Sequence, residues 1–229
     1  MISRITENLG SIFWSLLSSD FIRYYFVRIR YQILKRNLRV LESFKDTANI
    51  LYNMDFNRAS FGCGGRMALL LFPLRALLFP LEKKAKVLII GPRTEDDIFW
   101  ARAIGLRSAR GFDLFSYSPF IDVGDANNMP EIDGAYDAVL LGWVTPYTPT
   151  PERLISEVER VVKPGGYVGV AWHWVADKKY LETDTIRDNK LNEPDDFLCL
   201  FKSKEIVYKY SIDSELGGED GNKAFIIKV

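Results

Sequence analysis

The stretch DANNMPEIDGAYDAVLLGWVTPYTPTPERLISEVERVVKPGGYVGV, residues 125–170, decides the fold. Residues 136–141, YDAVLL, are apolar apart from Asp137, as expected of a strand that is buried on both faces of a parallel sheet. A helix with proline in its first turn is predicted over residues 151–162. A turn, KPGG at residues 163–166, then leads into a second buried strand at residues 167–172. Two buried strands joined by a helix predict a parallel β-α-β unit.

The same alternation continues on both sides of this unit. The further elements predicted are strands at residues 86–90 and 111–115, helices at residues 95–104 and 195–202, and two C-terminal strands, EIVYKYSI and KAFIIKV. Strands that alternate with helices predict a mostly parallel sheet with helices on both faces.

The composition excludes some classes of protein. Lys and Arg number 30, and Asp and Glu also number 30, so the net charge gives no reason to expect a nucleic-acid partner. Hydrophobic residues make up 48% of the chain, which is typical of a folded globular protein. Cys63 and Cys199 lie far apart and outside any CxxC motif, so we expect no metal site and a reducing, cytoplasmic setting.

The chain is predicted to divide into an N-terminal helical extension, residues 1–82, and an α/β domain, residues 83–229. Within residues 21–45, apolar residues follow a helical period and alternate with basic ones: Phe21, Tyr24, Tyr25, Val27, Ile29, Ile33, Leu34 and Leu38 are apolar, and Arg23, Arg28, Arg30, Lys35, Arg36 and Arg39 are basic. The favoured interpretation packs the apolar face on the core and leaves a basic face in solvent. The alternative is peripheral attachment to an anionic membrane, aided by the apolar residues 67–81, which prolines interrupt too often for a spanning helix. Residues 47–66, rich in Asn, Ser and Gly, are predicted to form a mobile connection or lid.

Four features of residues 125–170 occur together in order. They are an acidic loop ending in Met129-Pro130, a strand that begins Tyr136-Asp137, a helix that ends Glu157-Val158-Glu159-Arg160-Val161, and the KPGG turn. In this order and spacing they resemble the class I S-adenosylmethionine-dependent methyltransferases, and the resemblance covers about residues 84–229. It implies a Rossmann-like seven-stranded sheet, mostly parallel, with an antiparallel C-terminal strand.

The resemblance also implies residues for the S-adenosylmethionine cofactor. Asp113, at the end of the second strand, corresponds to the carboxylate that accepts from the ribose hydroxyls. Asp125 corresponds to the acceptor for the adenine amine, the Ala126 amide would pair with the adenine ring, and Met129 would cover the base. Either aspartate could instead cap a turn. Asp137 is expected to order the local backbone.

The first loop departs from the family pattern. Gly91 occupies the position of the first loop glycine, but Arg93 and Glu95 replace the later glycines. Arg93 or the helix N-terminus could meet the methionine carboxylate of the cofactor. Glu95, with Asp96 and Asp97, could meet its ammonium group, or could only stabilise the helix start.

The methyl acceptor is expected beyond the strands at residues 136–141 and 167–172. Gly142, with the aromatic side chains of Trp143 and Tyr147, would surround the methyl group, and a packed aromatic loop is the alternative. The aromatic residues expected to contact an acceptor are Trp143, Tyr147, Trp172 and Trp174. His173, the only histidine, is the candidate general base, ahead of Asp177 and Tyr180.

Three functions remain open at this stage. The first is a methyltransferase for a small molecule or a saccharide, including a lipid-linked one. The second is an inactive methyltransferase fold kept as a binding or scaffold protein, which the missing glycines favour. The third, a dinucleotide oxidoreductase, is disfavoured because GxGxxG is absent. The sequence leaves both a monomer and a homo-oligomer open.

Overall fold

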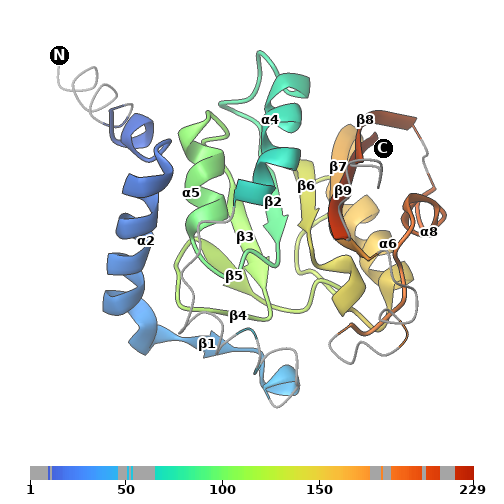
Figure 1. The fold of residues 1–229 in the computed structure, drawn as a ribbon, viewed down its shortest axis with the longest axis horizontal. Helices are drawn as coiled ribbons and strands as arrows, with labels where there is room; N and C mark the ends of the chain where they lie inside the picture. The colour runs from blue at the N-terminus through green and yellow to red at the C-terminus, as the bar shows by residue number, and fades with distance from the viewer. Residues whose placement is uncertain are drawn as a thin grey trace.

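The computed structural model describes residues 10, 12–45, 51, 53, 65–175, 182, 187–202, 205–211 and 220–229. At its centre is a seven-stranded sheet with the strand order β5-β3-β2-β6-β7-β9-β8 (Figure 1). The strands are β2 (Val87–Ile90), β3 (Arg110–Asp113), β5 (Ile121–Val123), β6 (Tyr136–Gly142), β7 (Val162–Val175), β8 (Glu205–Ser211) and β9 (Asp220–Lys228). Neighbouring strands pair parallel except around β9, which is antiparallel to β7 and to β8. This confirms the predicted mostly parallel sheet with an antiparallel C-terminal strand.

The central strands of the sheet are those that the apolar pattern of the sequence predicted most clearly. All four residues of β2 are buried, which is why a continuous apolar run identifies it. The strand β5 was missed because it has only three residues, of which Ile121 alone is buried. The strand β7 is longer than predicted, since it pairs with β9 as far as Val175.

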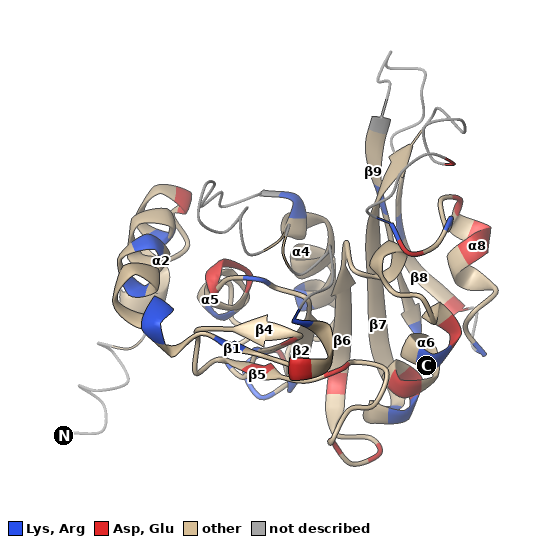
Figure 2. Ribbon diagram, turned by 90° about the horizontal axis from the view of Figure 1, so that it is seen from below, with Lys and Arg blue, Asp and Glu red and all other residues tan. Residues whose placement is uncertain are grey.

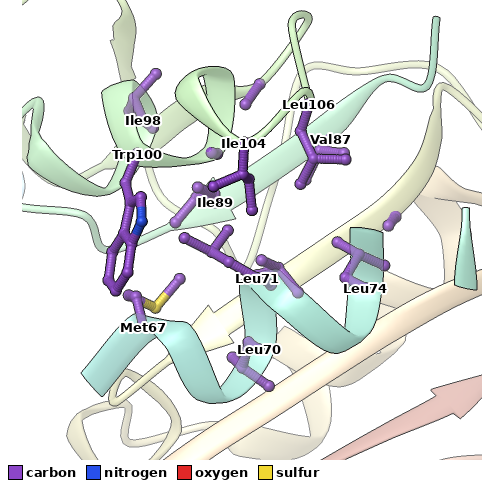
Figure 3. Packing of buried hydrophobic residues seen from close by; sticks show 14 of the residues in the cluster. Met67, Leu70, Leu71, Leu74, Val87, Ile89, Ile98, Trp100, Ile104 and Leu106 are labelled. Carbon is purple, nitrogen blue, oxygen red and sulfur yellow. The ribbon is translucent and has the colours of Figure 1, made fainter. Parts of the chain in front are cut away.

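One face of the sheet is covered by α4 (Ala68–Leu77) and α5 (Asp96–Ala103). Leu70, Leu71 and Leu74 of α4 are fully buried and pack with Val87 and Ile89 of β2 (Figure 3). These leucines therefore belong to the core of the domain and do not form a surface for a membrane. In the described part of the chain, no helix combines the length and apolar character needed to cross a bilayer.

The opposite face is covered by α6 (Pro151–Val161) and α8 (Pro194–Leu198). Leu154, Ile155 and Val158 of α6 are buried against Val139 and Leu141 of β6 and their neighbours. The two helical layers leave the carboxyl-terminal edge of the parallel strands to the connecting loops.

The helix α2 (Asp20–Leu34) lies beside α5 at the edge of the domain (Figures 1 and 2). Its orientation differs from the favoured prediction, although Arg28 is exposed. Arg23 is fully buried, whereas the apolar Phe21, Ile29 and Ile33 are exposed by 70%, 59% and 60%. The apolar face therefore looks outward.

Two ion pairs explain this orientation. Arg23 Nε donates to Asp96 Oδ1 at 2.7 Å, and Arg30 binds both carboxylate oxygens of Glu95 at 2.6 and 2.8 Å. Asp96 and Glu95 are buried at the start of α5, so each requires a buried cation. Val27 is buried between the two arginines and packs with Phe99 of α5.

The helix also ends earlier than residues 21–45 suggested. After Leu34 come two short 3-10 turns, Lys35–Asn37 and Glu42–Phe44, separated by β1 (Arg39–Val40). The strand β1 pairs antiparallel with β4 (Phe115–Ser116). Arg39 donates to the carbonyls of Ser118 and Ile121, which ties this segment to the loop between β4 and β5.

We expect Arg23→Met to lower the free energy of unfolding by about 3–5 kcal/mol, because it leaves the Asp96 carboxylate buried without its cation. Arg28→Met, at an exposed position on the same helix, should change it by less than about 0.5 kcal/mol. Urea unfolding followed by circular dichroism would measure both variants. The double variant Arg23→Met/Asp96→Met should recover most of the loss, because it removes both buried charges. Equal losses in the Arg23 and Arg28 variants would contradict the role given to the buried pair.

Candidate cofactor site

The candidate site lies where the carboxyl ends of β2, β3 and β6 meet. In open parallel sheets this edge is where ligands bind. It is formed by the loop after β2 at residues 91–95, the end of β3 at Asp113, the loop after β5, and the residues after β6 that lead into the 3-10 turn Thr145–Tyr147.

The loop after β2 keeps a left-handed backbone at two positions although one of them is not glycine. Gly91 has φ +70° and Arg93 has φ +49°. The Gly91 amide donates to the Phe112 carbonyl at 2.9 Å, and the Arg93 amide donates to Asp113 Oδ2 at 3.0 Å. A non-glycine residue at positive φ costs free energy and is concentrated at functional sites. Arg93, which stands where the family pattern has a glycine, therefore adopts the left-handed backbone that glycine favours.

The glycine that remains has a packing reason. A Cβ atom at Gly91 would lie only 2.2 Å from Val144 Cγ2, in the segment after β6. Gly142 is similar, since a Cβ there would lie 2.7 Å from Met67 Sδ. Both glycines allow the segments around the site to pack closely.

Asp113 connects β3 to this loop. Its Oδ1 accepts from the Leu114 amide at 2.7 Å, and its Oδ2 accepts from the Arg93 amide. Burial raises the pKa of Asp113 to about 6, against the effect of the hydrogen bonds from Arg93 and Leu114. The Phe115 amide also donates to this carboxylate, so its two oxygens keep one of their four lone pairs for a ligand hydroxyl.

The three acidic residues Glu95, Asp96 and Asp97 separate into two roles. Glu95 is fully buried, accepts from Arg30, and also accepts from the Ser118 hydroxyl at 2.6 Å. Asp96 pairs with Arg23. These two carboxylates hold α2, so Glu95 is not free to meet a cofactor ammonium, and its sequence-based assignment was wrong.

Asp97 is the remaining carboxylate. Burial raises its pKa to about 7, and the neighbouring Asp96 adds to this shift, while Arg66 and Arg93 act in the opposite direction. A half-titrated carboxylate beside two arginines is an acceptor suited to an ammonium group at neutral pH.

Arg66 also belongs to this group, although the sequence placed it in the predicted lid and not among the site residues. In the structure Arg66 precedes α4, and its guanidinium carbon lies 4.4 Å from the centre of the Trp143 ring. Burial, followed by repulsion from Arg93, lowers the pKa of Arg66, while Asp97 and Tyr147 oppose this. Of the other residues in the predicted lid, the structure describes Leu51, Asn53 and Gly65, and Asn53 accepts from Arg93 Nη1 at 3.2 Å.

Asp125 forms the turn that the alternative interpretation predicted. Its Oδ1 accepts from the Asn127 amide at 2.9 Å and from the Asn127 side-chain amide at 2.8 Å. Ala126 is partly buried, and Met129 is buried in the core against α6. Asp125 therefore has a structural role in the turn through Oδ1, and its Oδ2 can accept from a ligand.

The Glu-x-x-Arg sequence at the end of α6 holds this loop in place. Glu157 Oε2 accepts from the Met129 amide, and Arg160 donates to the carbonyls of Met129 and Glu131. Asp137 has a similar local role, because it accepts from the Lys86 amide at 2.7 Å and from Lys163 Nζ at 2.6 Å. It orders the backbone at the opposite end of the sheet, as expected.

The aromatic residues expected around the acceptor do not form one group. Trp143 and Tyr147 follow β6 in the chain, and both lie near Arg66. Trp172 is 1% exposed, stacks on Phe197 at 4.2 Å, and belongs to the core under α8. Trp174 lies on the same face and donates to Glu193 at 3.0 Å. Successive residues of a strand point to opposite faces, so Trp172 and Trp174 were assigned to the wrong face.

His173 points to the other face because it lies between these two tryptophans. It is exposed and pairs in the sheet with Asn222, whose Oδ1 accepts from Trp143 Nε1 at 2.9 Å. The weaker candidates Asp177 and Tyr180 lie outside the described residues. Within the part of the chain that is described, no three His, Cys, Asp or Glu side chains gather as a metal site would require.

Comparison with known proteins supports the fold and the family of residues 106–170. A family model described as a methyltransferase domain matches residues 106–170. The chain carries a class I methyltransferase domain. The putative methyltransferase complexed with the Haloferax volcanii Trm112 activator aligns with a TM-score of 0.55 and 16% identity, covering 82% of this chain and 96% of that one.

The curated relatives of this methyltransferase domain share only short segments with it. A demethylmenaquinone methyltransferase of Desulfitobacterium hafniense is 44% identical over 45 residues, which cover 20% of this chain and 18% of the relative. A sterol 24-C-methyltransferase of Gibberella zeae is 39% identical over 61 residues, which cover 27% of this chain and 16% of the relative. The chain thus spans less than a fifth of either relative.

We expect Gly91→Ala to lower the free energy of unfolding by about 2–4 kcal/mol, through left-handed strain and the clash with Val144. In a Val144→Ala background the same change should cost only about 1–2 kcal/mol, because the strain remains and the clash is removed. Chemical denaturation of the four proteins in this cycle would measure the difference. An equal cost in both backgrounds would show that Val144 is not the reason for the glycine.

Proposed function

We propose that the protein transfers a methyl group from S-adenosylmethionine to a small-molecule acceptor. The observation that carries this proposal is the convergence of the Gly91–Arg93 turn, Asp113 and Asp97 at one edge of a methyltransferase sheet. The proposal keeps the predicted extension at residues 1–82 and domain at residues 83–229, except that α4 (Ala68–Leu77) packs in the core of the domain and belongs with it.

The nucleoside part of the cofactor is assigned to β3 and the loop after β5. Asp113 accepts from a ribose hydroxyl with the lone pair that the Arg93, Leu114 and Phe115 amides leave free. Asp125 accepts from the adenine amine with Oδ2, and the Ala126 amide pairs with the ring. The hydrogen bond from Arg160 to the Met129 carbonyl supports this assignment, because it fixes the position of the loop after β5.

The amino-acid part of the cofactor is assigned to the start of α5 and of α4. Asp97 accepts from the ammonium group, and Arg66 and Arg93 donate to the carboxylate. The acidic side chain thus faces the positive group of the ligand, and the two basic side chains face its negative group. This arrangement replaces the close backbone approach that further glycines would allow.

Methyl transfer then needs a positioned nucleophile. Gly142 and Trp143 would flank the sulfonium of a bound S-adenosylmethionine, which supplies the methyl group: an acceptor oxygen or nitrogen would bond to the methyl carbon as the carbon–sulfur bond breaks. The exposed His173 takes the proton that the acceptor loses. The acceptor is a small molecule or a saccharide, which can carry a lipid, with Tyr147 offering an aromatic face.

An inactive binding protein is the second candidate, and the observation that favours it is Arg93 in place of a loop glycine. The left-handed backbone at Arg93 argues against this alternative, because that strain serves no purpose in a turn that binds nothing.

Calorimetric titration with S-adenosylmethionine tests the proposal. We expect binding to the wild type, and weakening of about 10- to 100-fold in Asp113→Asn, which loses a charge-assisted hydrogen bond to the ribose. Asp195→Asn, at an exposed carboxylate in α8, is the matched control and should bind as the wild type does. An absence of binding at millimolar cofactor would favour the inactive protein, and preferential binding of a nicotinamide dinucleotide would revive the oxidoreductase.

The pH dependence of cofactor binding tests the role of Asp97. Because its pKa is about 7, Asp97 is largely neutral at pH 6 and cannot pair with the ammonium group. Affinity for S-adenosylhomocysteine should therefore rise as the pH rises, by roughly ten- to twentyfold between pH 6 and 7.5, of which about twofold comes from Asp113, whose pKa is about 6. In Asp97→Asn the affinity should be lower and should rise by only the twofold that Asp113 contributes. The same slope in the variant as in the wild type would remove Asp97 from the site.

A further inference from the structure

The outward face of α2 carries a continuous apolar line. Phe21, Tyr25, Ile29 and Ile33 follow one another at intervals of four residues, and their exposed fractions are 70%, 49%, 59% and 60%. We call these four residues the outer stripe. Residues four apart lie on one side of a helix, so the outer stripe runs along the whole length of α2.

The outer stripe is wider than one row. Ile22 is 39% exposed beside it, and Ile12 and Leu16, before α2, are exposed by 58% and 51%. Single exposed apolar side chains are normal on a protein surface, but a contiguous group marks an interaction surface.

The helix cannot turn this surface inward. The opposite side of α2 is fixed by the buried pairs of Arg23 with Asp96 and of Arg30 with Glu95. Rotation that buried the outer stripe against α5 would break both pairs and leave two carboxylates buried without cations. The outer stripe is therefore presented outward on a rigid support.

The charges around the outer stripe are basic. Arg28, Lys35 and Arg36 are exposed on α2 and on the turn that follows it. The hydrogen bonds of Arg28 and Lys35 are to the neutral Tyr24 hydroxyl and Gln32 amide, so their charges are not cancelled. The only acidic residue of α2 is Asp20 at its first position, and it is paired with Arg23 (Figure 2).

We propose that the outer stripe docks in the surface of an anionic lipid bilayer. An apolar face that penetrates the headgroup region, next to arginines and lysines that meet anionic lipid, is the composition of a helix that lies in the membrane plane. A second copy of the chain fits less well, because pairing two outer stripes would bring the uncancelled cations of both helices together. This inference does not depend on methyl transfer.

Vesicle flotation of the full chain tests the proposal. We expect the protein to float with vesicles of phosphatidylcholine and phosphatidylglycerol, to float poorly with phosphatidylcholine alone, and to be released by high salt. Phe21→Glu/Ile29→Glu should reduce binding at least tenfold. Lys35→Gln and Arg36→Gln should each reduce it by about fivefold.

Matched controls distinguish membrane binding by the outer stripe from nonspecific binding through any exposed apolar side chain. Leu81→Glu/Ile132→Glu changes two apolar side chains that are exposed elsewhere by 65% and 79%, and should float as the wild type does. All variants should keep the unfolding midpoint of the wild type, because none of the changed side chains is buried. Calorimetry with S-adenosylhomocysteine on the same samples keeps this test distinct from that of the proposed activity.

Three results would overturn the proposal. The first is no flotation of the wild type with anionic vesicles. The second is equal flotation of the wild type and Phe21→Glu/Ile29→Glu. The third is a dimer in sedimentation velocity that the same double variant dissociates, since the outer stripe would then be an interface between two copies.

Discussion

The structure depends on two buried carboxylates at the start of α5. Glu95 and Asp96 are shielded from water at a helix N-terminus, and each is matched by an arginine of α2. An unpaired charge at either position would cost several kcal/mol, so the pairs fix which side of α2 faces the domain. Everything on the outer side of that helix, including its apolar line, follows from this constraint.

The two ion pairs also affect the candidate cofactor site, because Asp97 directly follows the paired carboxylates in the sequence. With Glu95 and Asp96 committed to α2, Asp97 is the acidic residue of the triplet left to face Arg66 and Arg93. The loop that precedes it keeps its left-handed turn with arginine in place of glycine. The positions that lack glycine in this loop therefore carry charged side chains at the same edge as Asp97 and Arg66.

The sequence predicted the sheet well and the site less well, for physical reasons. Buried parallel strands such as β2 are apolar throughout, and a motif such as Glu157-Val158-Glu159-Arg160 holds a local loop, so both leave a local signal. The orientation of α2 could not be predicted, because its apolar period indicates an amphipathic helix but not which partner neutralises Arg23. Trp172 and Trp174 were assigned to the acceptor by their position in the chain, and alternation along β7 places them on the opposite face from His173. Arg66 lay in a polar segment without periodicity, so only the fold could bring it to Trp143.

The proposed cofactor site depends most on Asp97, which would accept from the ammonium group of the ligand. A titration of the Asp97 carboxyl carbon by NMR, with and without S-adenosylhomocysteine, tests this role. We expect a pKa of about 7 in the free protein and a value well below this in the complex, because a bound ammonium group stabilises the carboxylate. The same pKa with and without saturating ligand would contradict it.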